Sequence, residues 1–333
     1  MKAVVRTEYG DTSVLRVEDV PEPVPDEGEV IVDVAAAGVN MAEWHMMSGQ
    51  PTLVRAFIGL RRPKRAVLGR DVAGIVSAVG TGVTRLRIGD VVFGSGRGAW
   101  AQKVSAQEAN LQPVPAGISL EQAATVPMSG YTALQALRVV GPLDGTRVAI
   151  TGAGGGVGSI AIQLAAARGA HVTAICSAGK HAFVRDLGAH DVIDYRKTDP
   201  THGGARFDAV LDFAGGLPLT DWRRVITPGG LLVLGGDENG GKVLGPLSRS
   251  LRARLTRGLR SVTLMASPTP EDIAELATAL TTGEMRPTHS RTFTFAEAAQ
   301  AVDAVRAATY PGKIALVPDS AASSGESQAR DIA

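Results

Sequence analysis

Five glycines fall within seven residues between Gly152 and Gly158, in the stretch TGAGGGVGSIAIQLA that spans residues 151–165. An apolar segment, VAIT, precedes the glycines, and an amphipathic segment with helical periodicity follows them. A strand, a glycine-rich turn and a helix in this order are typical of dinucleotide sites. Glycine lets the backbone approach a pyrophosphate, and the helix N-terminus offers free N–H groups and a positive dipole end. We therefore predict nucleotide binding here, although no frame of the stretch reads G-x-G-x-x-G.

The residues after the next predicted strand, HVTAICS, indicate which nucleotide is bound. Sites for NAD usually place an Asp or Glu at the end of this strand, where the carboxylate binds the ribose hydroxyls. No Asp or Glu occurs between Gly158 and Arg185, and Ser177 and Lys180 follow the strand instead. A lysine there can neutralise a 2′-phosphate, although a solvated surface lysine would give the same pattern. We predict NADPH as the cofactor.

A second stretch, NMAEWHMMSG at residues 40–49, holds the side chains that could transfer a proton. His45 could donate a proton to an enolate or a quinol, and Glu43 is the nearest carboxylate in the sequence. We take Asn40, Glu43 and His45 as the candidate catalytic residues. An alternative for His45 stays open, in which it bonds the cofactor ribose or packs in the core.

The elements that would carry these stretches fall into two parts. The first 110 or so residues read as short strands and turns. A helical stretch over 120–140 follows, and then apolar strands alternate with helices, which is typical of a parallel, doubly wound α/β sheet. Two helices and a last strand at 313–317 return to the first part. We predict one domain at 120–267 and another formed by 1–119 and 268–333. The strands expected in the α/β part are 147–151, 171–176, 192–195, 209–213, 231–235 and 261–266.

Size and composition set the class of protein. The 333 residues favour two domains, and 44% hydrophobic with 20% charged residues is ordinary for a globular protein. A net charge of +1 gives no overall attraction to nucleic acid or membranes. No apolar run is long enough to span a bilayer, and MKAVVRTEYG lacks the apolar core of a signal peptide. We expect a cytoplasmic protein without nucleic-acid or membrane partners.

An ordered series of motifs resembles the medium-chain dehydrogenase/reductase superfamily, in its zinc-independent quinone oxidoreductase-like branch, over nearly the whole chain. The resemblance implies a Rossmann doubly wound sheet plus a GroES-like β-rich domain, with NADPH in the cleft between them. The motifs are AAAGVNMAEWHMMSG (35–49), LGRDVAGIVSAVG (68–80), RIGDVVFG (87–94), VPMSGYTALQAL (126–137), TGAGGGVGSIAIQLA (151–165), FDAVLDFAGG (207–216), TPGGLLVLGG (227–236) and PGKIALV (311–317).

The same resemblance implies a set of cofactor-binding residues. It places the glycine fingerprint in the frame A-x-G-x-x-G. Asn40 and Thr132 would lie near the nicotinamide half of the cofactor. Each residue could instead be structural, as a turn glycine, a helix cap or a core side chain. The fingerprint and its inner residues are Ala153, Gly154, Gly155, Gly156, Val157 and Gly158. The residues expected around the adenosine 2′-phosphate are Ser177, Lys180 and Tyr195. Those expected after the fourth and fifth strands are Phe213, Ala214 and Gly235.

Departures from the zinc-dependent relatives indicate the reaction. Those relatives have a cysteine where Asn40 stands and a His-Glu pair where Arg70 and Asp71 stand, and the single cysteine, Cys176, cannot build their four-cysteine lobe. A catalytic zinc needs about three protein ligands, so we predict that no metal is bound. Without a metal to polarise an alkoxide, alcohol oxidation is hard to support. Hydride transfer to a conjugated acceptor is easier, because the charge spreads into an enolate or a quinol.

The leading hypothesis is therefore an NADPH-dependent reductase of quinones or α,β-unsaturated carbonyls. Two alternatives remain open. One is a dedicated enoyl reductase that tailors a secondary metabolite. The other is a non-catalytic NADPH-binding sensor or interaction protein.

Two further stretches have open interpretations. The basic insertion IGLRRPKRAV (58–67) could attract an anionic or polyphenolic acceptor, or it could be a solvated loop. The stretch LSRSLRARLTRGLRS (247–261) repeats leucine every four residues and predicts an amphipathic helix that covers the cleft or a subunit interface. The strand that follows it could pair with a second copy, so we expect a homodimer.

Overall fold

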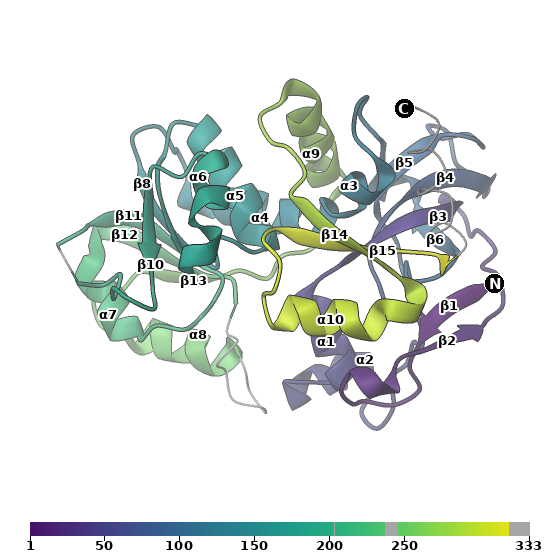
Figure 1. The fold of residues 1–333 in the computed structure, drawn as a ribbon, viewed down its shortest axis with the longest axis horizontal. Helices are drawn as coiled ribbons and strands as arrows, with labels where there is room; N and C mark the ends of the chain where they lie inside the picture. The colour runs from purple at the N-terminus through teal and green to yellow at the C-terminus, as the bar shows by residue number, and fades with distance from the viewer. Residues whose placement is uncertain (203, 237–245, 320–333) are drawn as a thin grey trace, which may run out of the picture.

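A computed structural model describes residues 1–202, 204–236 and 246–319, without the side chains of residues 246 and 247. Two large β-sheets organise these residues, one on each side of Figure 1. Within the described residues, no helix combines the length and the apolar character needed to cross a membrane.

The first sheet has six strands in the order β10-β9-β8-β11-β12-β13, and every neighbouring pair is parallel. Its strands are β8 (Arg147–Thr151), β9 (His171–Cys176), β10 (Asp191–Asp194), β11 (Phe207–Asp212), β12 (Ile226–Leu234) and β13 (Ser261–Thr263). The helices beside it are α4 (Pro127–Val140), α5 (Gly156–Ala167), α6 (His181–Asp186), α7 (Leu219–Val225) and α8 (Pro246–Leu255).

Successive residues of the strands face opposite sides of this sheet. Val148 and Ile150 of β8 pack in the cluster that holds α4 and α5. Ala149 packs with Trp222 of α7 and Ala253 of α8. Both faces are therefore covered by helices, and the predicted doubly wound parallel sheet is confirmed.

The second sheet has the order β14-β15-β3-β4-β5-β7, with β6 paired to β3. All of its pairs are antiparallel except β14 with β15. Pairing of β15 with β3 joins the end of the chain to its first third. The strands are β3 (Glu29–Val39), β4 (Asp71–Val79), β5 (Val91–Ser95), β6 (Lys103–Gln107), β7 (Leu111–Pro113), β14 (His289–Thr294) and β15 (Lys313–Val317).

Shorter elements surround the second sheet. A small hairpin-like sheet pairs β1 with β2, and α1 with α2 lies below it in Figure 1. These elements are β1 (Lys2–Val5), β2 (Arg16–Asp19), α1 (Met41–Ser48), α2 (Arg55–Ile58), α3 (Leu120–Ala124), α9 (Pro270–Thr282) and α10 (Ala298–Arg306). The 3₁₀ turns are η1 (Thr12–Val14), η2 (Thr52–Val54), η3 (Glu108–Asn110), η4 (Ala178–Lys180) and η5 (Phe295–Glu297).

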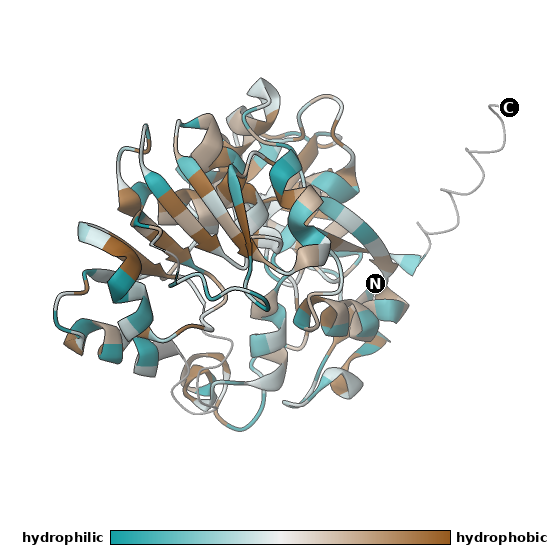
Figure 2. Cartoon of the chain, turned by 60° about the vertical axis from the view of Figure 1, so that its left-hand side comes forward, coloured by the Kyte–Doolittle hydropathy of each residue, from teal (hydrophilic) through white to brown (hydrophobic). Residues whose placement is uncertain are grey.

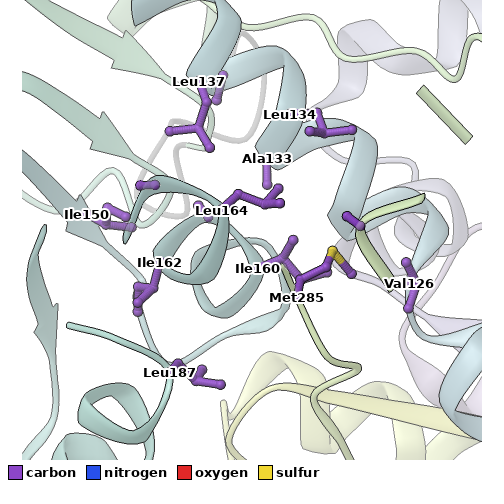
Figure 3. Close-up of a cluster of buried hydrophobic side chains, with 14 of the residues drawn as sticks. Val126, Ala133, Leu134, Leu137, Ile150, Ile160, Ile162, Leu164, Leu187 and Met285 are labelled. Carbon is purple, nitrogen blue, oxygen red and sulfur yellow. The ribbon is translucent and has the colours of Figure 1, made fainter. Parts of the chain in front are cut away.

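Helix α5 is held by apolar packing along its whole length. Ile160 and Leu164 lie among side chains of α4, including Leu134 and Leu137 (Figure 3). Figure 2 shows the same pattern as brown, hydrophobic strands through the middle of the molecule and polar segments around them. Because α5 is fixed in this way, its N-terminus is fixed at the end of β8.

Several local predictions differ from the structure. The strand expected over 261–266 ends at Thr263, the one expected over 231–235 begins at Ile226, and the helix expected over 247–261 ends at Leu255. The helix expected over 120–140 is broken at Thr125 and Val126, because Pro127 starts a new helix at its first position. The Thr125 hydroxyl caps the first piece by donating to the Gln122 carbonyl at 2.7 Å. Helix α1 was not expected at all, and it carries all three candidate catalytic residues at its N-cap or within it.

Candidate functional site

The glycine loop runs from the end of β8 to the start of α5. Gly152 has φ +62°, a conformation that favours glycine, and Gly155 is the N-cap of α5. A Cβ on Gly158 would contact the Gly152 carbonyl oxygen and lie 2.6 Å from the Ala153 Cα. Gly158 therefore allows the loop to fold back against its own helix. The first N–H groups of α5 have no partner within the helix and point to the loop side, where a pyrophosphate fits.

We expect Gly158→Ala to weaken NADPH binding about 100-fold, because relief of the backbone clash costs about 2–3 kcal/mol. Gly179→Ala is the matched control, since a Cβ there meets nothing within 4 Å. Fluorescence titration of NADPH onto both variants measures the effect. Equal affinity in the two variants would contradict this role of Gly158.

One face of the glycine loop is covered by Lys180. A Cβ on Gly154 would lie 2.5 Å from the Lys180 Cδ, so the lysine stem crosses the face of the loop. Its ammonium donates to the Tyr310 carbonyl at 3.2 Å, and burial lowers the pKa of Lys180. The Gly312 N–H donates to the Gly154 carbonyl at 3.0 Å. The segment that leads into β15 thus contacts the glycine loop and the predicted phosphate lysine together.

The other residues expected at the 2′-phosphate lie nearby in the sheet. Asp194 pairs with Cys176, so Tyr195 follows β10 beside Ser177, which follows β9. Tyr195 is 51% exposed, with the Arg196 guanidinium 5.7 Å from its ring. Parallel strands end at one edge of a sheet, and this edge carries Ser177, Lys180 and Tyr195.

A buried ion pair orders the loop after β11. Asp212 accepts a hydrogen bond from the Thr151 hydroxyl at 2.6 Å and one from the Gly215 N–H at 3.0 Å. Arg249 of α8 donates to the Asp212 carboxylate and to the Gly215 carbonyl. The carboxyl ends of β8 and β11 are therefore tied together at the strand order reversal, where doubly wound sheets bind ligands.

The residues expected after the fourth and fifth strands lie around this ion pair. The Ala214 N–H donates to the Thr151 hydroxyl at 3.1 Å. Gly235 donates to the Asp212 carbonyl at 3.0 Å. A Cβ on Gly235 would lie 2.5 Å from the Phe213 ring, so the ring rests on the glycine. The structure brings Phe213, Ala214 and Gly235 together at one strand edge.

A second buried cluster lies on the other side of the glycine loop. The Asn40 side-chain amide donates to the Asp71 carboxylate at 3.1 Å and accepts from the Lys313 ammonium. Lys313 also donates to the Val39 carbonyl at 2.8 Å and lies 4.0 Å from the Asp71 carboxylate. The Met128 N–H donates to Asp71 at 3.0 Å. Three segments that are far apart in the sequence thus fix one amide.

Lys313 connects this cluster to the glycine loop. A Cβ on Gly156 would contact the Lys313 Cδ and lie 2.7 Å from the Ser129 hydroxyl. Thr132 lies one helical turn beyond Met128 in α4, and its hydroxyl donates to the Met128 carbonyl at 2.6 Å. Asn40 and Thr132, expected near the nicotinamide, therefore lie on the same side of the loop.

Glu43 gives this cluster a group that titrates near neutral pH. Its carboxylate accepts from the Asn40 backbone N–H at 2.7 Å, which caps α1. Its other oxygen is buried without a hydrogen-bond partner. Burial, and then the charge of Asp71, raises the pKa of Glu43 to about 7, while the Lys313 ammonium acts in the opposite direction. Burial also raises the pKa of Asp71 and lowers that of Lys313.

His45 is held in one orientation. Its Nδ1 lies 2.8 Å from the Gln50 carbonyl oxygen, and a carbonyl only accepts, so Nδ1 carries the hydrogen. Burial lowers the pKa of His45, partly offset by this bond. At neutral pH the ring is therefore uncharged, and Nε2 can accept a proton but has none to donate. A donating role for His45 requires the charged ring.

Sequence reasoning did not assign a role to several site residues. Lys313 had a usable signal, because a lysine inside the apolar strand KIALV is costly to bury without a partner. Asp212 had the same signal at the end of VLD. Arg249 had none, since it looked like one of many arginines on a surface helix. The missed residues are Asp71, Thr151, Asp212, Arg249 and Lys313.

Possible metal ligands are scattered. Within residues 1–202, 204–236 and 246–319, no group of three or more His, Cys, Asp or Glu side chains is arranged to hold a metal ion. The free thiol of Cys176 is buried, and burial raises its pKa to about 11.

Comparisons with known proteins agree with this geometry. The Alcohol dehydrogenase GroES-like domain family matches residues 26–116, and the Zinc-binding dehydrogenase family matches residues 187–316. A chloroplast envelope quinone oxidoreductase homolog of Arabidopsis thaliana is 34% identical over 70% of this chain and 74% of its own. The human mitochondrial NAD(P)H oxidoreductase RTN4IP1 is 32% identical over 95% of this chain and 89% of its own. A mycobacterial protein solved with NADPH superposes with TM-score 0.80 at 27% identity, over 96% and 100% of the two chains.

The class of protein is defined by three findings: the two matching domain families, the glycine loop at the strand reversal and the similarity over nearly the full length. The chain belongs to the medium-chain dehydrogenase/reductase superfamily, in its quinone oxidoreductase-like branch.

Proposed function

We propose that the protein is a zinc-independent reductase that uses NADPH to reduce quinones or α,β-unsaturated carbonyls. The observation that carries this proposal is the placement of the buried Asn40–Asp71–Lys313 network directly beside the glycine loop. The family resemblance implies that this side of the loop faces the nicotinamide, and the similarity to a quinone oxidoreductase homolog supports the acceptor class.

Asn40 can orient a bound group because both of its polar atoms are already fixed. An amide offers two donor hydrogens and two lone pairs. One hydrogen is used on Asp71 and one lone pair on Lys313. One donor and one acceptor position remain, and they point in set directions. The nicotinamide cofactor supplies the hydride when bound; the protein supplies orientation and a proton.

Glu43 is the carboxyl that holds a proton around neutral pH. Its pKa of about 7 matches the optimum for general acid–base catalysis. His45 lies on the same short helix, and burial lowers its pKa. We propose that Glu43 and Asn40 act at the reacting end, with His45 as the further candidate.

Independence from zinc is supported by the residues at the ligand positions of zinc-dependent relatives. The Asn40 amide is held by hydrogen bonds to Asp71 and Lys313, and Arg70 stands beside Asp71. One of the matching families is described as zinc-binding, so elemental analysis of the purified protein tests this part of the proposal. Stoichiometric zinc would overturn it.

Preference for NADPH is supported by Lys180, which lies across the glycine loop where an adenosine ribose approaches. We expect Lys180→Ala to lower kcat/KM for NADPH about 10- to 100-fold, because it removes one charge-assisted contact. The value for NADH should change little. Lys103→Ala, which removes a surface lysine of the other sheet, is the control. Equal efficiency of NADH and NADPH in the wild type would contradict NADPH preference.

We also propose a homodimer. Helix α8 turns Arg249 and Ala253 inward and leaves two of its leucines outside, with Leu251 61% and Leu255 75% exposed. Val262 of the edge strand β13 and Met265 are exposed as well. An apolar face beside an unpaired strand edge suits a second copy of the chain.

A further inference from the structure

The segment between α1 and β4 concentrates positive charge. From Trp44 to Arg70 the sequence has six lysines and arginines and no Asp or Glu, in a chain whose net charge is +1. Four of these cations are exposed, and none forms an ion pair with a described residue. They are Arg61, Arg62, Lys64 and Arg65. We call these four cations, together with the exposed Leu53, Phe57 and Leu60, the basic–apolar loop.

The same segment exposes large apolar side chains. Phe57 is 78% exposed, Leu60 74% and Leu53 41%. Exposed apolar groups that cluster in this way mark contact surfaces more often than isolated ones. Leu53, Phe57 and Leu60 directly precede the four exposed cations in the sequence, so one short stretch exposes both apolar and positively charged side chains.

The loop is held in this shape by its own hydrogen bonds. The Lys64 N–H donates to the Ile58 carbonyl at 2.8 Å, and the Tyr9 hydroxyl donates to the Gly59 carbonyl at 2.5 Å. Gly59 has φ +124°, and a Cβ there would contact the Arg62 carbonyl. The backbone is thus closed into a tight turn, and Phe57 and Leu60 stay outside it.

The loop is close to the candidate site. Arg55 of α2 donates to the Gly49 carbonyl at 3.0 Å, at the C-terminal end of α1. Asn40 caps the other end of the same helix, which is about 12 Å long at eight residues. Figure 1 shows α1 and α2 together at the lower edge of the molecule, below α10.

We propose that the basic–apolar loop docks the protein on an anionic lipid surface. Exposed aromatic and aliphatic side chains enter the headgroup boundary, and neighbouring lysines and arginines pair with lipid phosphates. A small soluble anion would need converging, partly buried cations and would have no use for Phe57 and Leu60. Attachment here would bring a lipid-soluble acceptor within one helix length of Asn40. The inference departs from the expectation of no membrane partner, which rested on the net charge and on the absence of an apolar run long enough to span a bilayer.

The test is sedimentation of the full-length protein with lipid vesicles, which does not depend on enzymatic activity. We expect binding to vesicles of phosphatidylcholine mixed with phosphatidylglycerol, little binding to phosphatidylcholine alone, and loss of binding at high salt. Phe57→Ser/Leu60→Ser and Arg61→Glu/Arg62→Glu should each weaken binding about tenfold or more.

Matched controls carry the same changes elsewhere. Val24 and Ile88 are exposed apolar residues, 81% and 66%, so Val24→Ser/Ile88→Ser should bind as the wild type does. Arg87→Glu/Arg206→Glu repeats the charge change at exposed positions of the same chain. No binding to anionic vesicles, or equal losses in loop and control variants, would overturn the proposal. A third outcome would also overturn the proposal: the protein does not bind vesicles, and the loop variants have a raised KM for a soluble anionic acceptor. That outcome would assign the loop to substrate binding.

Discussion

Lys313→Met should lower the free energy of unfolding by about 3–5 kcal/mol, because it leaves buried acids without their counter-charge. Lys313 is 5% exposed, and its ammonium faces Asp71 and the Asn40 amide. Whole-protein stabilities are only about 5–15 kcal/mol, so the loss should be obvious in urea unfolding. Lys313→Arg keeps the charge and should lose much less.

The loss of stability in Lys313→Met should depend on pH in a defined direction. Burial raises the pKa of both Asp71 and Glu43, so both are neutral at low pH and need no cation. Lys313→Met should therefore cost less near pH 5 than near pH 8. Adding Asp71→Asn should restore part of the stability. A loss that is the same at both pH values would mean that Lys313 acts through packing and not through charge.

The variant also tests the orientation of Asn40. If Lys313 sets the direction of the amide, Lys313→Met should lower kcat more than it raises KM for NADPH, since the glycine loop is intact. Lys313→Arg should recover part of kcat. A rise in KM alone would indicate damage to cofactor binding, through the contact between Lys313 and Gly156.

Glu43→Gln should change how stability depends on pH. The pKa of Glu43 is raised from 4.5 to about 7, mainly by burial. Between these values the folded protein keeps a proton that the unfolded chain has lost, so wild-type stability falls as pH rises. The contribution is about 3 kcal/mol across the interval. Glutamine does not titrate and can still accept a hydrogen bond from the Asn40 N–H. The stability of Glu43→Gln should therefore rise by this amount relative to the stability of the wild type over the same pH interval.

Urea unfolding of wild type and Glu43→Gln at about pH 5 and about pH 8 measures the difference. Glu8→Gln removes an exposed carboxyl and serves as the control. If the free energies of unfolding of wild type and Glu43→Gln change by the same amount between the two pH values, the raised pKa of Glu43 is contradicted. Activity gives a second readout. If Glu43 donates the proton, the wild-type rate should fall above neutral pH as Glu43 loses its proton, and the rate of Glu43→Gln should lack this fall.

Much of the α/β sheet could be predicted because its signals are local. Apolar runs such as VAIT and VLD form strands buried on both faces, and the glycine cluster marks the turn between β8 and α5. Strand 313–317 was predicted with the same bounds that the structure shows. The order of the elements predicted that the chain returns to its first domain, but the pairing of β15 with β3 is a long-range contact that no local pattern contains.

The catalytic side was harder to predict because its residues meet only in three dimensions. Asn40 follows β3, Asp71 begins β4 and Lys313 begins β15, and the three share one network that no local pattern contains. Helix α1 was missed because it buries Glu43 and Ser48 together with Met47, so its inward face is not apolar. In α8 the leucine repeat gave the helix but not its orientation, since Arg249 is turned inward by Asp212.

The most direct test of the account is NADPH oxidation by the purified protein against quinones, enones, aldehydes and ketones. We expect acceptor-dependent NADPH oxidation with quinones or enones and little oxidation with simple aldehydes and ketones. The rate with quinones or enones should fall markedly in Asn40→Ala. Tight NADPH binding without turnover on any acceptor, or zinc-dependent turnover of alcohols, would contradict the proposed function.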